Sequence, residues 1–238
     1  MFLSFKQFLA EGMVPGISPG TENESVILDA IRSHLDKVSP LTIILQSATK
    51  KKVYRDITDV LDRSKDTRNR KKADFVLISK DMKEYPISLK NDKADFWESC
   101  DGLMGAKARK IIDRLVSKGK IQLNYDKDTE NYSIDPHVAL KATPEEASAV
   151  MFGTDILPKG AVIKRTFSPD DFVLDNDTLT ISCTEVITSV NDVTDTYMEP
   201  WFFIRSEQGR NVVPLGYRGL RCLAAYKRRI DTDKILKI

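Results

Sequence analysis

Histidine and cysteine are scarce in this 238-residue chain, which contains two histidines and three cysteines. With only His34 and His137 available, catalytic triads, histidine-based nucleases and histidine–metal sites are poorly supplied. Both histidines are expected to be structural or surface residues. Cys100, Cys183 and Cys222 lie far apart in the sequence and have no paired spacing. This odd, sparse set argues for a reducing compartment and against a zinc site.

Several long or specific patterns are also missing. No run approaches the roughly 18 apolar residues that a membrane span needs, and no basic-then-apolar secretory leader opens the chain. We therefore expect a cytoplasmic protein that does not enter a membrane. The chain also lacks three common enzyme motifs: the phosphate-cradling Gly-x-x-x-x-Gly-Lys, the dinucleotide-binding Gly-x-Gly-x-x-Gly and the Gly-x-Ser-x-Gly nucleophile elbow. Their absence argues against the enzyme classes that depend on them.

What the chain does have is an uneven distribution of charge. Hydrophobic residues make up 41% and charged residues 30%, as in ordinary globular proteins, and the formal net charge is only +2. The stretches 63–72 and 107–120 are densely basic, however, whereas 170–195 is mostly acidic. Positive charge is thus concentrated on either side of residues 74–90.

Residues 74–90 read as a β-hairpin. Phe75–Ile78 and Tyr85–Leu89 are two short apolar runs, and the polar residues between them supply the turn. Folding the chain back about residue 82 places Asp74 opposite Lys90. Because side chains alternate along a strand, one face then carries Glu84, Pro86, Ser88 and Lys90. The pattern predicts that a carboxylate, a hydroxyl and an ammonium converge.

This hairpin resembles that of the PD-(D/E)xK nuclease superfamily, in which an Asp on one strand is followed by Glu-x-Lys on the next. Asp74 and Lys90 match the motif, while Ser88 stands where the family usually carries an acid. The resemblance covers roughly residues 22–115. It implies an α/β restriction-endonuclease-like mixed sheet flanked by helices, and a metal-dependent endonuclease that hydrolyses DNA. The alternative is a half-buried hairpin with a solvated lysine.

The resemblance also implies a Mg²⁺ (or Mn²⁺) site and a role for the first helix, expected from Thr21 to about Lys37. In these nucleases a Glu of that helix points at the metal. Glu24 is the candidate and Glu22 its substitute, although simple helix capping explains Glu24 equally well. The implied metal ligands are Asp74, Glu24, the carbonyl of Leu89 and Glu84. Lys90 would orient water, and Ser88 would add a hydrogen bond or a water-bridged contact.

Two basic segments are the candidate DNA-binding surface. The loop residues are Arg63, Lys65, Arg68, Arg70, Lys71 and Lys72, and the residues of a helix over about 103–117 are Lys107, Lys110, Arg114 and Lys118. Cations at three- and four-residue spacing on one helical face suit a phosphate backbone. An ordinary solvated face has the same pattern. The expected partners are DNA and a second copy of the chain in a homodimer.

Periodicity outlines the rest of the chain. We expect a strand at 41–45, a helix at 50–62, a hairpin at 121–125 and 131–134, and a helix that starts at Thr143 with a capping box. Later segments are rich in strands. The predicted domains are an N-terminal peptide and linker (1–20), a nuclease-like core (21–140) and a β-rich C-terminal extension or subdomain (141–238).

The first eleven residues favour a short amphipathic helix, followed by a linker broken by Gly and Pro. They resemble the capsid-targeting peptide of internal head proteins of large contractile-tailed phages, which a prohead protease cuts after Glu. Leu9-Ala10-Glu11-Gly12 fits that pattern. The resemblance implies docking to the capsid scaffold through residues 1–11, and location in the virion interior and then the host cytoplasm. A helix that packs on the protein's own surface fits equally well.

Two other functional classes remain open. One is a catalytically silent DNA-binding head protein, for which Ser88 is the best argument. The other is an internal phage protein that inhibits a host-defence enzyme and needs neither metal nor DNA. Metal-dependent cleavage separates the nuclease from both, and salt-sensitive DNA binding separates the second class from the third.

Overall fold

The computed structural model describes residues 19–63, 72–92, 96–153, 155–189, 191–192, 201–206, 215–225 and 235–238. They form two compact units. The first lies within Met1–Ala94 and Phe152–Thr188, and the second within Asp95–Met151 and Ser189–Ile238. This division differs from the predicted boundary near residue 140, because the chain returns to the first unit after residue 152. The predicted N-terminal peptide lies almost entirely outside the described residues.

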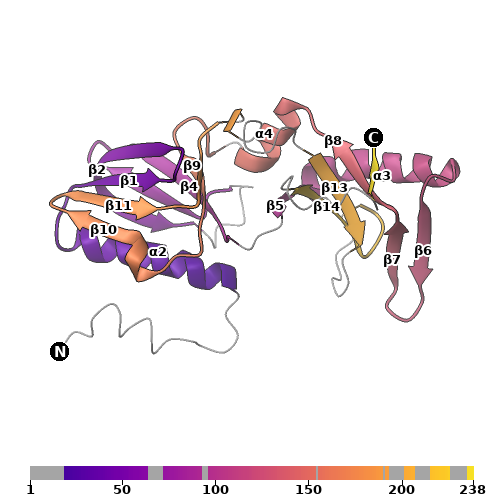
Figure 1. The fold of residues 1–238 in the computed structure, drawn as a ribbon, viewed down its shortest axis with the longest axis horizontal. Helices are drawn as coiled ribbons and strands as arrows, with labels where there is room; N and C mark the ends of the chain where they lie inside the picture. Colours follow the sequence, from indigo (N-terminus) through magenta and orange to yellow (C-terminus); the bar gives the residue numbers. More distant parts are fainter. Residues whose placement is uncertain are drawn as a thin grey trace. The chain divides into compact units, whose positions relative to one another are not determined.

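The described part of the first unit contains one α-helix, α2 (Pro19–Leu35), and one large sheet. Its strands are β1 (Leu41–Gln46), β2 (Lys51–Asp62), β3 (Phe75–Ser79), β4 (Glu84–Lys90), β9 (Ala161–Lys164), β10 (Phe172–Asp175), β11 (Thr178–Ser182) and β12 (Glu185–Ile187), and a 3-10 turn, η2 (Pro169–Asp171), precedes β10. The spatial order is β10-β11-β1-β2-β3-β4-β9-β12 (Figure 1). The β1–β11 and β4–β9 pairs are parallel and the other pairs antiparallel, so the predicted mixed α/β fold is confirmed at this level.

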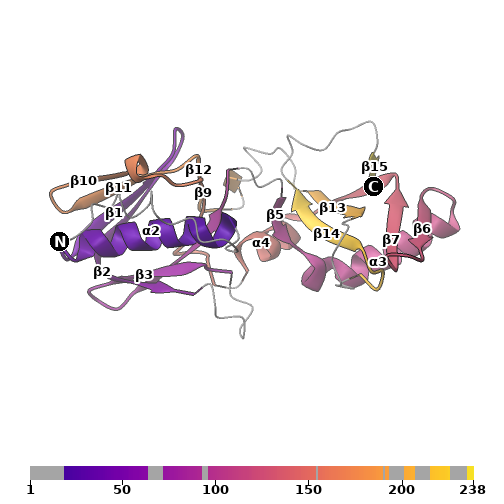
Figure 2. The ribbon, with the colours of Figure 1, turned by 90° about the horizontal axis from the view of Figure 1, so that it is seen from below.

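Helix α2 runs along one face of this sheet (Figures 1 and 2). Ile27 and Ile31 are fully buried and share a core with Leu77 and Ile87 of the hairpin. Apolar residues three and four apart form one stripe on a helix, and that stripe covers the sheet. The helix begins at Pro19, two residues before the predicted start at Thr21.

Strand β2 corrects the predicted helix at 50–62. Tyr54, Ile57 and Val60 are buried at a spacing of three, which resembles one face of a helix. Two bulges produce this spacing. Between Tyr54 and Ile57, β2 advances three residues while β1 advances two, and between Ile57 and Asp59 it advances two while β3 advances one. Each extra residue resets the alternation of side chains, so a strand acquires a helical period.

Residues 161–187, predicted to belong to the C-terminal part, complete the sheet of the first unit. Strand β9 pairs with β4 in parallel, with Ala161 opposite Ile87 and Lys164 opposite Lys90. The turn that leads into β9 passes so close to β4 that a Cβ at Gly160 would lie 1.8 Å from the carbonyl oxygen of Pro86. Only glycine fits this approach.

The second unit contains α3 (Asp101–Ser117) and most of α4 (Pro144–Phe152). Its strands are β5 (Phe96–Ser99), β6 (Gln122–Asp126), β7 (Asn131–Asp135), β8 (His137–Lys141), β13 (Trp201–Ser206), β14 (Leu220–Ala225) and β15 (Ile235–Lys237). One sheet has the order β15-β8-β13-β14-β5, and β6 and β7 form the predicted hairpin. The predicted capping box is confirmed: Thr143 Oγ1 accepts from the Glu146 amide at 3.2 Å, and Glu146 Oε2 accepts from the Thr143 amide at 3.0 Å.

The fold brings together two cysteines that the sequence separates widely. The sulfur atoms of Cys100 and Cys222 lie 3.1 Å apart, both buried and both reduced, because Cys100 directly follows β5 and Cys222 lies on the neighbouring strand β14. Their wide separation along the chain gave no sign of this contact. No helix in the described part of the chain is long and apolar enough to span a membrane.

Candidate functional site

Asp74 lies directly before β3 and is fixed by both neighbouring strands. Its amide donates to the carbonyl of Ile87, and its own carbonyl accepts from the amide of Arg63, each at 2.8 Å. One carboxylate oxygen, Oδ2, accepts from the Ser88 hydroxyl at 3.0 Å and from the Leu89 amide at 2.6 Å. The side chain of Asp74 therefore takes the place of a main-chain partner at this end of the sheet.

The hairpin is confirmed, but its register differs from the predicted one by two residues. Phe75 lies opposite Ile87 and Ile78 opposite Glu84, which brings Asp74 level with Ser88 rather than Lys90. A shift of two residues preserves the face on which each side chain lies. The carboxylate and the hydroxyl accordingly meet, as predicted, while Lys90 lies further along β4.

Ser88 is almost fully buried, with 1% of its surface exposed. Its hydroxyl satisfies part of the hydrogen-bonding capacity of Asp74 without adding charge. An acid in this position would place a second carboxylate beside Asp74 in a site from which water is excluded. Such a pair is stable only with a proton or a cation between its members.

Glu24, on the second turn of α2, is electrostatically coupled to this end of the sheet. Partial burial raises the pKa of its carboxyl to about 6, and repulsion by Asp74 and Asp62 adds to the rise, while attraction by Lys90 opposes it. Four of the predicted site residues, Glu24, Asp74, Ser88 and Lys90, are thus gathered at one end of the sheet. Asp62, at the end of β2, joins them without having been predicted.

Two further predicted ligands do not join this group in the predicted way. Glu84 pairs with Ile78 and contacts Arg63 through an ion pair of 3.6 Å. Four residues of strand separate Ile78 from Asp74, a distance of about 13 Å, so the structure does not bring Glu84 to Asp74. Leu89 does meet Asp74, but through its amide N–H.

Asp155 is a site residue that sequence reasoning missed. Its carboxylate accepts from the amide of Lys72 at 3.0 and 3.1 Å and from the amide of Ala73 at 3.2 Å. It thereby anchors the two residues that precede Asp74. Nothing in the sequence pairs residue 155 with residue 72, because the contact depends on the return of β9 to the sheet.

The predicted DNA-binding residues are divided between the two units. Arg63 contacts Glu84 and Lys72 is half-buried, whereas Lys65, Arg68, Arg70 and Lys71 lie outside the described residues. The four cations of α3, Lys107, Lys110, Arg114 and Lys118, are exposed as predicted, and Lys107 pairs with Glu146 at 2.6 Å. Helix α3 belongs to the second unit.

Within the described ranges, no three His, Cys, Asp or Glu side chains are grouped so that they hold a metal ion. Burial first, and then the like charges of Asp74 and Asp62, oppose the ionisation of Glu24. Searches of family models, curated proteins and solved structures found no match to this chain.

Proposed function

We propose that this chain is a metal-dependent endonuclease that hydrolyses phosphodiester bonds of DNA, with a restriction-endonuclease-like core in its first unit. The observation that carries the proposal is the meeting of Asp74 and Ser88 across the hairpin, with Glu24 and Lys90 in electrostatic reach. Carboxylates and a lysine at one end of a mixed sheet provide both a cation site and a donor for developing negative charge.

Each residue has a distinct role in this proposal. Asp74 and Glu24 would hold Mg²⁺ or Mn²⁺, which supplies Lewis-acid polarisation of the phosphate and a more acidic water. Lys90 orients the attacking water or donates to the phosphate oxygens as their charge grows. Ser88 fixes one oxygen of Asp74, so that the remaining lone pairs keep a constant direction.

The fit of these residues to a divalent cation rests on charge. The pKa of Glu24 stands at about 6, so the carboxyl is mostly ionised at pH 7.5 despite the repulsion of Asp74 and Asp62. A cation beside these groups would relieve that repulsion. Its binding is therefore expected to lower the pKa of Glu24.

The test is incubation of the purified chain with supercoiled and linear DNA in the presence of Mg²⁺, Mn²⁺ or EDTA. Asp74→Asn and Lys90→Ala are the informative variants, because Asn keeps an acceptor for Ser88 and Leu89. Asp36→Ala and Lys37→Ala, exposed positions just beyond α2, are the controls for charge. Cleavage that requires metal, disappears in the first pair and persists in the second supports the proposal. Absence of cleavage under every condition refutes it.

A second candidate, a catalytically silent DNA-binding protein, is favoured by one observation. Ser88 occupies the place of the family's second acid and is buried against Asp74. In this case the exposed cations of α3 bind the DNA backbone, and affinity falls steeply with salt. DNA binding without cleavage, weakened by Lys110→Ala and Arg114→Ala together, would support this candidate.

In either case, we propose that the protein is carried in a phage head. The support is the sequence Leu9-Ala10-Glu11-Gly12, which lies outside the described residues. Cleavage after Glu11 by a prohead protease, detected as a new N-terminus at Gly12 in protein from virions, is the test. An intact N-terminus in virion protein contradicts this part of the proposal.

A further inference from the structure

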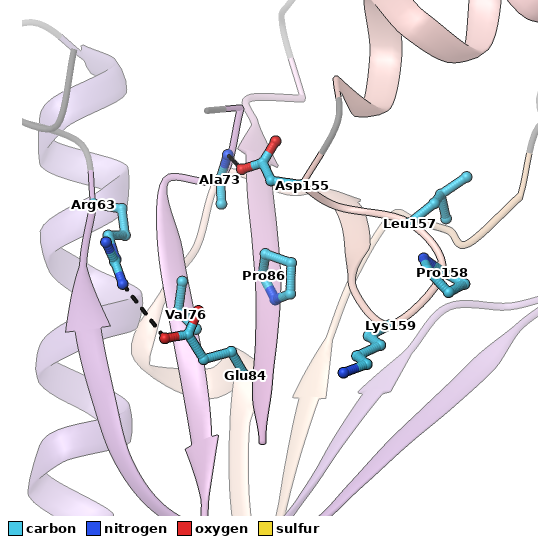
Figure 3. A pocket seen from close by; sticks show the side chains of 9 residues that line it. All are labelled: Arg63, Ala73, Val76, Glu84, Pro86, Asp155, Leu157, Pro158 and Lys159. Atoms are coloured by element: carbon cyan, nitrogen blue, oxygen red, sulfur yellow. Dashed lines mark hydrogen bonds and ion pairs between the residues drawn. The ribbon is translucent and has the colours of Figure 1, made fainter. Parts of the chain in front are cut away.

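A pocket of about 270 Å³ lies on the hairpin of the first unit, beside the candidate site (Figure 3). It is formed by Arg63, by residues of the hairpin, and by the turn 155–159, which is distant from them in the sequence. The lining residues are Arg63, Ala73, Val76, Glu84, Pro86, Asp155, Leu157, Pro158 and Lys159. Its volume is slightly below the range of about 300–1,000 Å³ that is usual for drug-sized ligands. The pocket therefore suits a small ring compound.

The pocket and the candidate site are neighbours in the hairpin, although Asp74, Ser88, Lys90 and Glu24 are not among the pocket's lining residues. Glu84 and Pro86 line the pocket, and Ser88 is the next residue on the same face, because side chains alternate along a strand. On the adjacent strand, Ala73 lines the pocket and its neighbour Asp74 binds Ser88. The pocket is therefore lined by the residue that precedes Asp74 in the chain and by the residue two positions before Ser88.

The walls combine flat apolar groups with charged ones. Val76, Pro86, Leu157 and Pro158 form apolar surfaces suited to the faces of a heterocyclic ring. Figure 3 shows Glu84 and Lys159 at one end of the pocket and Ala73 with Asp155 at the other. An apolar slot with a few polar groups at its ends is the usual form of a site for a nucleobase.

The polar groups favour one kind of base. The carboxylates of Glu84 and Asp155 accept hydrogen bonds. Glu84 contacts Arg63, Asp155 accepts from the amides of residues 72 and 73, and a carboxylate has more lone pairs than these contacts use. Carboxylates read the amino group of cytosine, whereas the guanidinium of Arg63 donates to ring carbonyl oxygens. A uracil-type base would direct a carbonyl oxygen at a carboxylate instead.

We propose that this pocket receives one cytosine base of the DNA strand, and that Lys159 binds the phosphate of that nucleotide. The assignment rests on the proposed nuclease function, since it names a specificity subsite of the same active site. With this pocket, the first unit would recognise the identity of a base in addition to binding the DNA backbone.

Equilibrium binding of mononucleotides to the full chain tests the assignment separately from cleavage. Deoxycytidine monophosphate and deoxyuridine monophosphate differ at C4, which carries an amino group or a carbonyl oxygen, and at the adjacent N3, which accepts or donates a hydrogen bond. Inorganic phosphate reports binding of the anion alone. Lys159→Ala and Leu157→Ala remove a cation and a wall of the pocket. Lys37→Ala removes an exposed cation beyond the end of α2 and is the control.

We expect the cytidine nucleotide to bind at millimolar concentration and at least about fivefold more tightly than the uridine nucleotide, as one good base contact provides. Lys159→Ala and Leu157→Ala should each weaken this binding severalfold, and Lys37→Ala should not. Equal affinity for both nucleotides and phosphate would show an anion site and overturn the assignment. The absence of saturable binding would also overturn the assignment, and so would binding that neither Lys159→Ala nor Leu157→Ala weakens.

The cleavage assay distinguishes failure of this inference from failure of the proposed function. Base-selective nucleotide binding in a protein that cleaves no DNA refutes the nuclease and supports the pocket as a base-binding site. Cleavage of DNA without nucleotide binding supports the nuclease and refutes the pocket as a base-binding site. If the protein both cleaves DNA and binds nucleotides selectively, Lys159→Ala should alter the sequence preference of cleavage, and Lys37→Ala should leave it unchanged.

Discussion

Replacement of Glu24 by Gln is predicted to stabilise the protein at neutral pH. The carboxyl of Glu24 has its pKa raised from 4.5 to about 6, first by burial and then by the repulsion of Asp74 and Asp62. This difference corresponds to about 2 kcal/mol at 1.36 kcal/mol per pKa unit. Because Glu24 is only half-buried, solvent screening halves the figure to about 1 kcal/mol.

The pH dependence has a definite sign. An acid whose pKa is higher in the folded state binds its proton more tightly there, so its favourable contribution is fully present below about pH 4.5 and is lost as pH rises through about 6. Glu24→Gln removes the charge that causes the loss. The variant should match the wild type at pH 4.5 and exceed it by about 1 kcal/mol at pH 7.5, or about 2–4 °C in Tm.

Thermal and urea unfolding at the two pH values, without divalent cations, provide the measurement. Glu22→Gln is the matched control, since Glu22 is an exposed acid in the first turn of the same helix. An equal effect at both pH values, or an equal effect of Glu22→Gln, would refute the argument that Glu24 is coupled to Asp74 and Asp62. If the cation binds beside Glu24, added Mg²⁺ should reduce the difference in stability between the wild type and Glu24→Gln at pH 7.5.

Three other variants test different parts of the structure. Leu77→Ala, at a fully buried position of β3, should cost about 2–5 kcal/mol in urea unfolding, and a loss below about 1 kcal/mol would contradict the assigned core. Asp155→Ala should cost about 1–3 kcal/mol in the same assay by leaving two amides unpaired, unlike Asp170→Ala at an exposed turn. Mild oxidation with diamide should form a Cys100–Cys222 disulfide, visible as the loss of two hydrogens in intact mass. Cys222→Ser should abolish it, whereas retention of the mass change in that variant would refute the pairing.

The hairpin was predictable because its signal is local. Two apolar runs of strand length, separated by polar residues, specify β3 and β4 without reference to any other part of the chain. The meeting of Asp74 and Ser88 survived an error of two residues in register, because face is conserved when the shift is even. The local pattern of apolar and polar residues thus predicted the part of the site that lies within the hairpin, the contact between Asp74 and Ser88.

The rest of the fold depends on contacts between distant residues. The period of three in β2 comes from two bulges, which a single sequence does not distinguish from a helical stripe. The return of residues 161–187 to the first sheet rests on the parallel pairing of β9 with β4, and a strand pattern does not name its partner. Asp155 and the pocket it lines follow from that pairing, so neither was foreseeable.

Ser88 connects the stability of the site with its function. A buried acid at this position would need a cation beside it to offset repulsion by Asp74, and folding would then depend on metal. The hydroxyl instead donates to Asp74 at 3.0 Å and adds no second charge beside it. In the proposed function, a cation at this site would therefore be bound by Asp74 and Glu24 at the end of the sheet, and relief of the repulsion between the two carboxylates would add to its affinity. Under the proposed function, Ser88 therefore leaves to Glu24 the second negative charge beside Asp74.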